Sequence, residues 1–206
     1  MKGRQLRDVF ATLKRKAVPW GTLSATCHVA YKARDPTPWC QCEAIVRAPV
    51  EDVMAAIWAV DSEPMRYSKD VRYTVHGPRP PTARSVRWDF HFRPPLGTGE
   101  IISYVQGVWQ QHRATPDPQG ELSRTFEIVW LPRSEGLTQA EINRSSSIHG
   151  FILLEHIGEG VTRLEYTYQV ELASNFAIIR RLVRNADLFT VLHHRAIVKS
   201  LVLHFQ

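Results

Sequence analysis

The chain has 206 residues, 44% of them hydrophobic, and a formal net charge of +6. This length and hydrophobic content fit one domain with a sizeable core. No stretch approaches the roughly 18 apolar residues that span a bilayer, the N-terminus lacks a hydrophobic signal peptide, and 3 cysteines do not make a disulfide framework. We therefore expect a single domain over residues 1–206, cytoplasmic and at most peripheral to membranes, with organelle targeting left open.

The positive charge is concentrated near the beginning of the chain. Residues 1–34 hold eight Lys and Arg against one acid, whereas the remaining residues hold 18 against 19. Over residues 1–20, apolar side chains recur at helical spacing between basic ones, which predicts a basic amphipathic helix. Three roles are open for this helix: it packs its apolar edge on the domain, it attracts anionic lipid, or it serves as an organelle presequence.

From residue 26 the pattern changes to the alternation that is typical of strands. Segments 26–33 and 40–48 form an expected pair across a proline-containing turn, and Pro49 then begins a short helix. Further strands are expected at 71–75, 86–92, 100–109, 124–131, 140–157 with an irregularity near Gly150, and 161–172. The short turns between them favour an antiparallel sheet.

The last segment, residues 174–205, runs without proline or glycine through a repeating apolar pattern. Ser174 is a candidate N-cap, and the predicted helix has one apolar face opposite a face of basic residues. His193 lies in the apolar stripe, where an imidazole needs either a backbone partner in the core or a polar cavity. The order of elements predicts an α+β fold, in which a curved antiparallel sheet closes over one long C-terminal helix.

Three runs of the sequence carry a resemblance to a known family. They are Ala44-Ile-Val-Arg-Ala-Pro-Val-Glu-Asp-Val-Met-Ala-Ala-Ile-Trp, Val86-Arg-Trp-Asp-Phe-His-Phe-Arg-Pro-Pro-Leu, and Gly158-Glu-Gly-Val-Thr-Arg-Leu-Glu-Tyr-Thr-Tyr ahead of the terminal helix. In this order they resemble the START domain, the lipid-transfer family of the Bet v 1-like helix-grip superfamily. The resemblance spans nearly the whole chain and implies a helix-grip fold with an internal cavity between sheet and C-terminal helix. Departures at Gly99-Glu100 and at residues 171–175 leave the identity of the ligand open.

The resemblance implies that the cavity binds a lipid, a sterol or another largely apolar molecule, for transfer between membranes or for sensing. We expect an elongated pocket on the order of several hundred Å³. Large aromatic side chains on the inward face are typical of such a pocket and equally of a filled core. The expected lining residues are Trp88, Phe90, Phe92, Phe126, Trp130, Tyr166 and Tyr168, with Phe189 and His193 from the helix.

Four side chains are expected to give this pocket its polar anchors. These are Glu100 and Gln106, which share the inward parity of one predicted strand with the expected lining residue Tyr104, and Arg144 and Ser146, which have the inward parity of another. Arg144 is the leading charged anchor. The alternative for Arg144 is a position of misjudged parity, or a side chain that reaches to the edge of the sheet.

No motif indicates a catalytic residue, a cofactor or a metal site. The sequence has no Gly-x-Ser-x-Gly elbow, phosphate loop, His-Glu-x-x-His helix or dinucleotide fingerprint. Cys40 and Cys42 share one strand face, but no second Cys or His pair has zinc-site spacing, so we interpret both as small core residues.

Two other functions remain as alternatives. A polyketide cyclase or aromatase on the same fold would use Glu100, Arg144 or His193 to move a proton. A nucleic-acid-binding module ranks third, because the excess positive charge lies on one terminal helix and not along a groove with stacking aromatics. We therefore expect a monomer with a lipid- or sterol-like ligand, transient contact of the N-terminal helix with anionic membrane, and no nucleic-acid partner.

Overall fold

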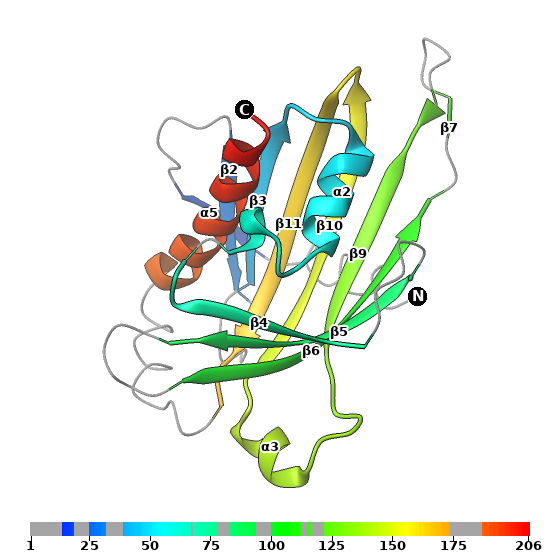
Figure 1. The fold of residues 1–206 in the computed structure, drawn as a ribbon. Helices are drawn as coiled ribbons and strands as arrows, with labels where there is room; N and C mark the ends of the chain where they lie inside the picture. The colour runs from blue at the N-terminus through cyan, green and yellow to red at the C-terminus, as the bar shows by residue number, and fades with distance from the viewer. Residues whose placement is uncertain are drawn as a thin grey trace.

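The computed structural model describes the fold of residues 14–18, 25–31, 39–66, 68–77, 83–93, 100–112, 115–116, 122–173 and 187–206. In this part of the chain, nine strands form one antiparallel sheet with the order β1-β2-β3-β11-β10-β9-β6-β5-β4 (Figure 1). Two very short strands, β7 and β8, pair separately.

The strands of the sheet, in chain order, are β1 Lys14–Val18, β2 Ala25–Tyr31, β3 Trp39–Val46, β4 Val71–His76, β5 Ser85–Phe92, β6 Ile101–Gln111, β9 Thr125–Pro132, β10 Ser147–Gly158 and β11 Val161–Glu171. The separate pair is β7 Thr115–Pro116 and β8 Leu122–Ser123. The described helices are α2 Val50–Trp58, the 3₁₀ turn η1 Glu63–Met65, α3 Gln139–Arg144 and α5 Asp187–His204.

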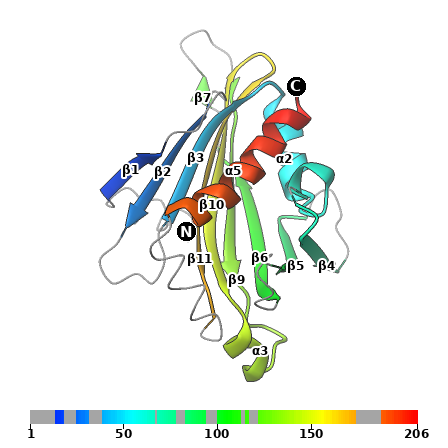
Figure 2. The ribbon, with the colours of Figure 1, turned by 90° about the vertical axis from the view of Figure 1, so that its left-hand side faces the viewer.

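The sheet is curved, and two helices lie on one of its faces. Strands β4, β5 and β6 cross the lower part of the molecule at a steep angle to β10 and β11, while α2 and α5 both lie against the upper part, with η1 between them (Figures 1 and 2). We call the face that these helices cover the inner face. α5 packs on β3 and η1, and α2 packs on β10, β11 and β9. The core therefore lies between the sheet and these two helices.

Strand alternation decides which residues enter this core. In β5, Val86, Trp88 and Phe90 are buried, and the residues between them point to the opposite, outer face. This agrees with the alternation predicted from the sequence for residues 86–92. The same alternation on β11 buries Leu164, Tyr166 and Tyr168 on the inner face.

α5 packs on a strand with small side chains. The inner face of β3 carries Cys40, Cys42 and Ala44, all buried, and α5 contributes Ile197 and Leu201 to the same core cluster. Small residues on a strand let a helix approach closely. Both cysteines are thus core residues, as the sequence indicated.

The structure describes α5 over the second half of the predicted helix 174–205, and residues 174–186 lie outside the described part. The side chains of Phe189 and His193, within α5, lie outside it too. No helix in the described part has both the length and the hydropathy needed to cross a bilayer.

The predicted N-terminal helix over 1–20 is wrong where the structure describes it. Lys14–Val18 is strand β1, which pairs with Ala25–Tyr31 through five residue pairs. Backbone pairing at a sheet edge overrides the local helical spacing, and lysines are common on exposed edges because they discourage further strand pairing. Residues 1–13 and 19–20 lie outside the described part.

The predicted strand over 140–157 is also wrong in its first part. Gln139–Arg144 forms helix α3, and the strand begins only at Ser147. Thr138 and Glu141 make a capping box, in which each side chain accepts a hydrogen bond from the other residue's backbone N–H. This local pair starts a helix where the apolar spacing alone suggested a strand.

Candidate ligand pocket

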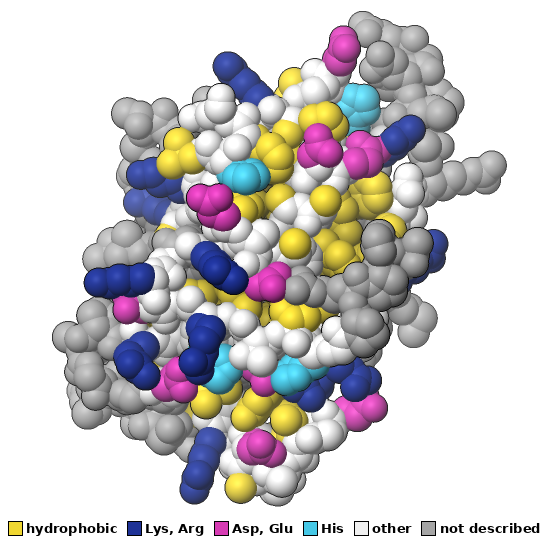
Figure 3. Space-filling model, in the orientation of Figure 1, with side chains coloured by type: hydrophobic (Ala, Val, Ile, Leu, Met, Phe, Trp, Pro, Cys, Tyr) yellow, Lys and Arg dark blue, Asp and Glu magenta, His cyan; other side chains and the backbone are white. Residues whose placement is uncertain are grey.

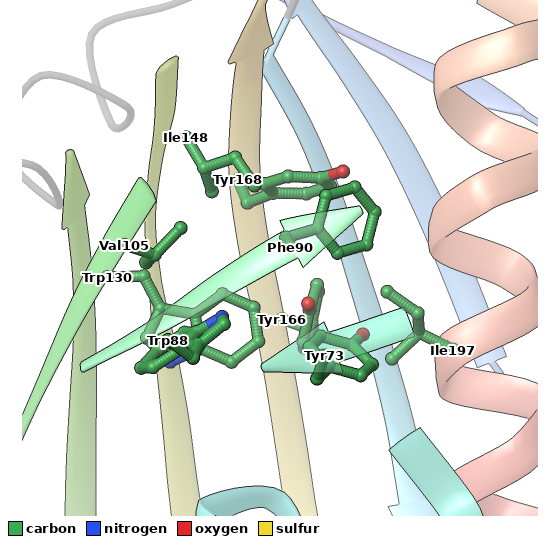
Figure 4. Close-up of a pocket in the computed structure, with 9 residues that line it drawn as sticks. All are labelled: Tyr73, Trp88, Phe90, Val105, Trp130, Ile148, Tyr166, Tyr168 and Ile197. Atoms are coloured by element: carbon green, nitrogen blue, oxygen red, sulfur yellow. The ribbon is translucent and has the colours of Figure 1, made fainter. Parts of the chain in front are cut away.

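A small pocket lies between the inner face of the sheet and α5 (Figure 4). Its lining comes from six strands and one helix, and Ile197 is the residue that α5 contributes. The lining residues are Tyr73, Trp88, Phe90, Val105, Trp130, Ile148, Tyr166, Tyr168 and Ile197. All nine are aromatic or aliphatic, so apolar groups dominate the surface that a ligand would meet.

The cavity between these side chains has a volume of about 20 Å³. A void of this size holds about one water molecule. The nine residues therefore do not by themselves enclose the expected several hundred Å³, and residues 174–186 of the predicted helix, which would complete the expected pocket, lie outside the described part. The rings of the sheet pack against each other where the sequence suggested an open tunnel.

Four aromatic rings of the lining form one edge-to-face chain. The ring centroids are 5.6 Å apart between Trp88 and Trp130, 5.5 Å between Trp130 and Tyr166, and 6.0 Å between Tyr166 and Tyr168. Their interplanar angles of 80°, 82° and 74° give the T-shaped geometry that ring quadrupoles favour. The rings therefore stabilise one another beyond the burial of their area.

Two glycines make room for this chain of rings. Gly107, Trp130, Gly150 and Tyr168 lie in one cross-strand row over β6, β9, β10 and β11. A Cβ atom at Gly107 would lie 2.6 Å from the ring of Trp88, and one at Gly150 would lie 2.6 Å from the Cβ atom of Tyr168. Side chains at these two positions would collide with the aromatic wall, which explains glycine on both sides of Trp130.

Three tyrosines bring hydroxyl groups to the pocket without bringing charge. The Tyr73 hydroxyl donates to the carbonyl oxygen of Met65 in η1 at 3.3 Å. Burial raises the pKa of Tyr73, Tyr166 and Tyr168 well above the ordinary value for tyrosine. These phenols therefore stay neutral at physiological pH.

Five of the residues predicted from the sequence come together in this pocket: Trp88, Phe90, Trp130, Tyr166 and Tyr168. Two others share the inner face but lie elsewhere. Phe92 is half-buried beside Leu172 and Ala173. Phe126 is buried against Trp109, whose ring in turn contacts Trp58 of α2.

The polar anchors predicted from the sequence do not reach the pocket. Arg144 is exposed in the last turn of α3, which lies beyond the lower end of the sheet (Figures 1 and 2). Ser146 is buried, but its hydroxyl oxygen accepts a hydrogen bond from the Ala173 N–H at 3.2 Å, which ties two chain segments together. Both were assigned to a strand that begins only after them.

Glu100 and Tyr104 belong to the outer side of the sheet, so the parity predicted for this strand was wrong. In β6 the buried set is Ile101, Ser103 and Val105. The even-numbered residues point outward, although they include the larger side chains. Tyr104 lies under the guanidinium of Arg133, with 5.7 Å between the guanidinium carbon and the ring centroid.

The outer face here is an ionic surface. Asp89 accepts from Arg133 at 2.9 Å and from His76 at 2.7 Å, and Glu100 lies 3.6 Å from Arg72. Figure 3 shows basic, acidic and histidine side chains close together over this lower region, with apolar side chains visible between them. Glu100 therefore serves a surface ion pair and does not anchor a ligand in the pocket.

Sequence reasoning missed Tyr73, Val105, Ile148 and Ile197 as pocket residues. The alternation of Val71, Tyr73 and Val75 carried the signal for Tyr73. Val105 follows once the parity of β6 is correct. The cyclase alternative loses two of its three candidates for proton transfer, because Glu100 and Arg144 do not face the pocket.

No protein-family model matches the chain, and no curated protein sequence matches it. Solved structures match it across nearly its whole length. The human StarD13 (DLC2) lipid transfer and protein localization domain superposes with a TM-score of 0.63 at 14% identity, covering 100% of this chain and 95% of its own. The chain has a START-like fold.

Two further START structures support this fold. Human StAR-related lipid transfer protein 5 gives a TM-score of 0.65 at 12% identity, with coverage of 98% of this chain and 92% of its own. The STAR-related lipid transfer protein from Xanthomonas axonopodis gives a TM-score of 0.63 at 12% identity, with coverage of 93% of this chain and 98% of its own. The START-like fold thus persists although almost nine residues in ten differ, and the likeness concerns the fold alone.

Proposed function

We propose that this START-like domain binds a largely apolar small molecule, a lipid, a sterol or a similar compound, between α5 and the inner face of the sheet. The bound molecule is carried between membranes or sensed. The observation that carries the proposal is the pocket of nine aromatic and aliphatic residues, to which α5 contributes Ile197. Proteins of the same fold are named for lipid transfer, which supports the same reading.

Binding requires the pocket to enlarge. A cavity of about 20 Å³ is far below the roughly 300–1,000 Å³ that ligand pockets have. α5 faces the pocket through an aliphatic side chain, and the opposite wall is made of rings held by weak edge-to-face contacts. In our proposal, outward movement of α5 together with rotation of these rings admits the ligand.

Native mass spectrometry of freshly purified protein, with organic extraction of any bound molecule, tests the proposal. We expect one apolar molecule per chain. Ile197→Trp should fill the pocket and abolish this adduct, whereas Leu203→Trp, which adds the same ring at a half-exposed position on α5, should keep it. Thermal unfolding confirms that both variants fold. Protein that carries no adduct and takes up no lipid from vesicles would contradict the proposed function.

Membrane contact is a separate part of the proposal. Lys14, Arg15 and Lys16 lie together in the edge strand β1, within the stretch that holds the excess positive charge. Basic residues near an anionic bilayer contribute about 1 kcal/mol each. We therefore propose that this stretch draws the protein to membranes that contain anionic lipid.

Vesicles of phosphatidylcholine with phosphatidylserine test membrane contact. Replacing Lys14, Arg15 and Lys16 by Gln should weaken binding at least about tenfold at low salt. The matched control replaces Arg47, Arg66 and Lys69, all exposed, and changes the net charge equally. Equal losses in the two triple variants would show that net charge, and not β1, governs the attraction.

A further inference from the structure

Ser103 of β6 has a buried hydroxyl group without a hydrogen-bond partner among the described residues. The residue is 0% exposed, and its Oγ is among the buried polar atoms that find no partner. Buried hydroxyl groups are hydrogen-bonded in the great majority of proteins, because an unsatisfied one costs free energy. An exception in a well-packed core therefore calls for an explanation.

The position of Ser103 connects it to the pocket. It lies on the inner face of β6, opposite Phe90 of β5 and two residues before Val105. Phe90 and Val105 both line the pocket. The nearby Ser146 is different, because its buried hydroxyl already accepts from the Ala173 N–H. Of these two serines, Ser103 keeps its hydrogen-bonding capacity for another molecule.

The rest of the lining limits the charge of that molecule. The nine lining residues are aromatic or aliphatic, and burial keeps the three tyrosines neutral. An ionised group placed among them would lose its hydration without meeting a counter-charge, which is strongly unfavourable. A hydroxyl or carbonyl oxygen loses much less hydration free energy on burial, and a hydrogen bond to Ser103 replaces the one that it made to water.

We propose that Ser103 binds a neutral oxygen, a hydroxyl or a carbonyl, of the molecule held in the pocket, and that the site selects uncharged ligands over ionised ones of the same shape. This inference rests on the proposed function and specifies its ligand class. It assigns to Ser103 the anchoring role that the sequence suggested for Arg144.

Three probes on one ring system test the inference: pyrene, 1-pyrenemethanol and 1-pyrenecarboxylate. Their binding is measured by quenching of tryptophan emission through energy transfer to the pyrene. The parent protein should bind 1-pyrenemethanol at least about 100-fold more tightly than the carboxylate at pH 8, because the nine described lining residues offer no counter-charge. Equal affinity for these two probes would overturn the inference.

Ser103→Ala separates anchoring from a structural role. It should weaken binding of 1-pyrenemethanol about 2- to 10-fold, the worth of one neutral hydrogen bond, and leave pyrene unchanged. Without ligand, the same variant should raise Tm by about 2–4 °C, because it removes an unsatisfied buried hydroxyl. Ser134→Ala, on the exposed turn after β9, should change neither quantity.

The outcomes separate this inference from the proposed function. If the parent binds none of the three probes, both fail. If the parent binds pyrene and 1-pyrenemethanol and Ser103→Ala binds both as tightly as the parent, the anchoring role of Ser103 fails and the apolar site stands. A fall in Tm on Ser103→Ala would identify the hydroxyl as a structural group and overturn the inference as well.

Discussion

Gly150 lies between Trp130 and Tyr168 in its cross-strand row, and its lack of a side chain is a steric requirement. An added Cβ would lie 2.6 Å from the Tyr168 Cβ and 2.7 Å from the carbonyl oxygen of Thr167. Both obstacles belong to the backbone or lie next to it, so neither can rotate away. The strand itself has to shift.

Gly150→Ala should therefore destabilise the protein by about 1–3 kcal/mol, the usual result of overpacking a core. Urea unfolding measures the change. Gly158→Ala is the matched control on the same strand, because a Cβ at Gly158 meets nothing within 4 Å, and its effect should stay within about 0.5 kcal/mol. If the two variants are equally stable, β10 is free to move away from β11, and the close packing of the row does not constrain the fold.

At the scale of single residues, sequence patterns predicted the aromatic residues of the pocket but not the polar residue that we propose as the ligand anchor. Trp88 and Phe90 are identified by strict alternation in β5, where every second residue is large and apolar. Ser103 could not be identified, because its strand places a small polar residue on the buried face and Tyr104 on the outer one. Tertiary packing determines that Tyr104 lies on the outer face, because its ring there contacts Arg133, which is paired with Asp89.

At the scale of elements, the first turn of α2 is tied to the sheet by one ion pair. Glu51 of α2 accepts a hydrogen bond from Arg124, the residue before β9. Partial burial raises the pKa of Glu51, but the hydrogen bond from Arg124 and its positive charge outweigh this and hold the pKa below the ordinary value. The negative charge also suits the N-terminal end of a helix.

A folded-state pKa below the unfolded value makes this pair a source of acid sensitivity. Its stabilisation is present above pH 4.5 and is lost as pH falls through the lowered folded-state pKa. Glu51→Gln should lower stability at pH 7 by at most about 1 kcal/mol, since both side chains are half-exposed. Thermal unfolding is measured from pH 3 to pH 8, and the Tm values of the parent and of Glu51→Gln should converge at the acid end.

The exposed Glu159 in the turn between β10 and β11 provides the control for that experiment. The difference in Tm between Glu159→Gln and the parent should stay constant from pH 3 to pH 8. A Glu51→Gln difference that persists unchanged at pH 3 would mean that the side chain acts through its shape and not through its charge.

Elements differ in how well the sequence predicts them. The strands from 71 to 131 are predictable, because turns with glycine or proline bound each run of alternation. β1 is not, because Lys14–Val18 carries no alternation that distinguishes it and its strand form depends on pairing with β2. α3 carried a readable signal, the capping box of Thr138 and Glu141, which the apolar spacing of the following residues concealed.

At the scale of the whole molecule, the order of helix and strand signals was enough to predict a curved antiparallel sheet under a C-terminal helix. The size of the pocket was not predictable. Inward aromatic residues give the same sequence pattern whether their rings line a tunnel or fill it, and only rotamers and helix position decide between the two. Here the rings of Trp88, Trp130 and Tyr166 pack edge to face, and the nine described lining residues leave a void of about 20 Å³ between them.

The reactivity of the two buried cysteines of β3 reports how often α5 moves away from the sheet, which is the motion that ligand entry requires. Cys40 and Cys42 are 0% exposed on the strand against which α5 packs, and a buried thiol does not react with a disulfide reagent until the structure opens. In a Cys27→Ser background, labelling by 5,5′-dithiobis(2-nitrobenzoate) far below Tm should follow the opening of α5. Pyrene bound between α5 and the sheet should slow this labelling in proportion to occupancy. Labelling that proceeds only at the rate of global unfolding would mean that α5 stays closed, so that ligand reaches the pocket by another route.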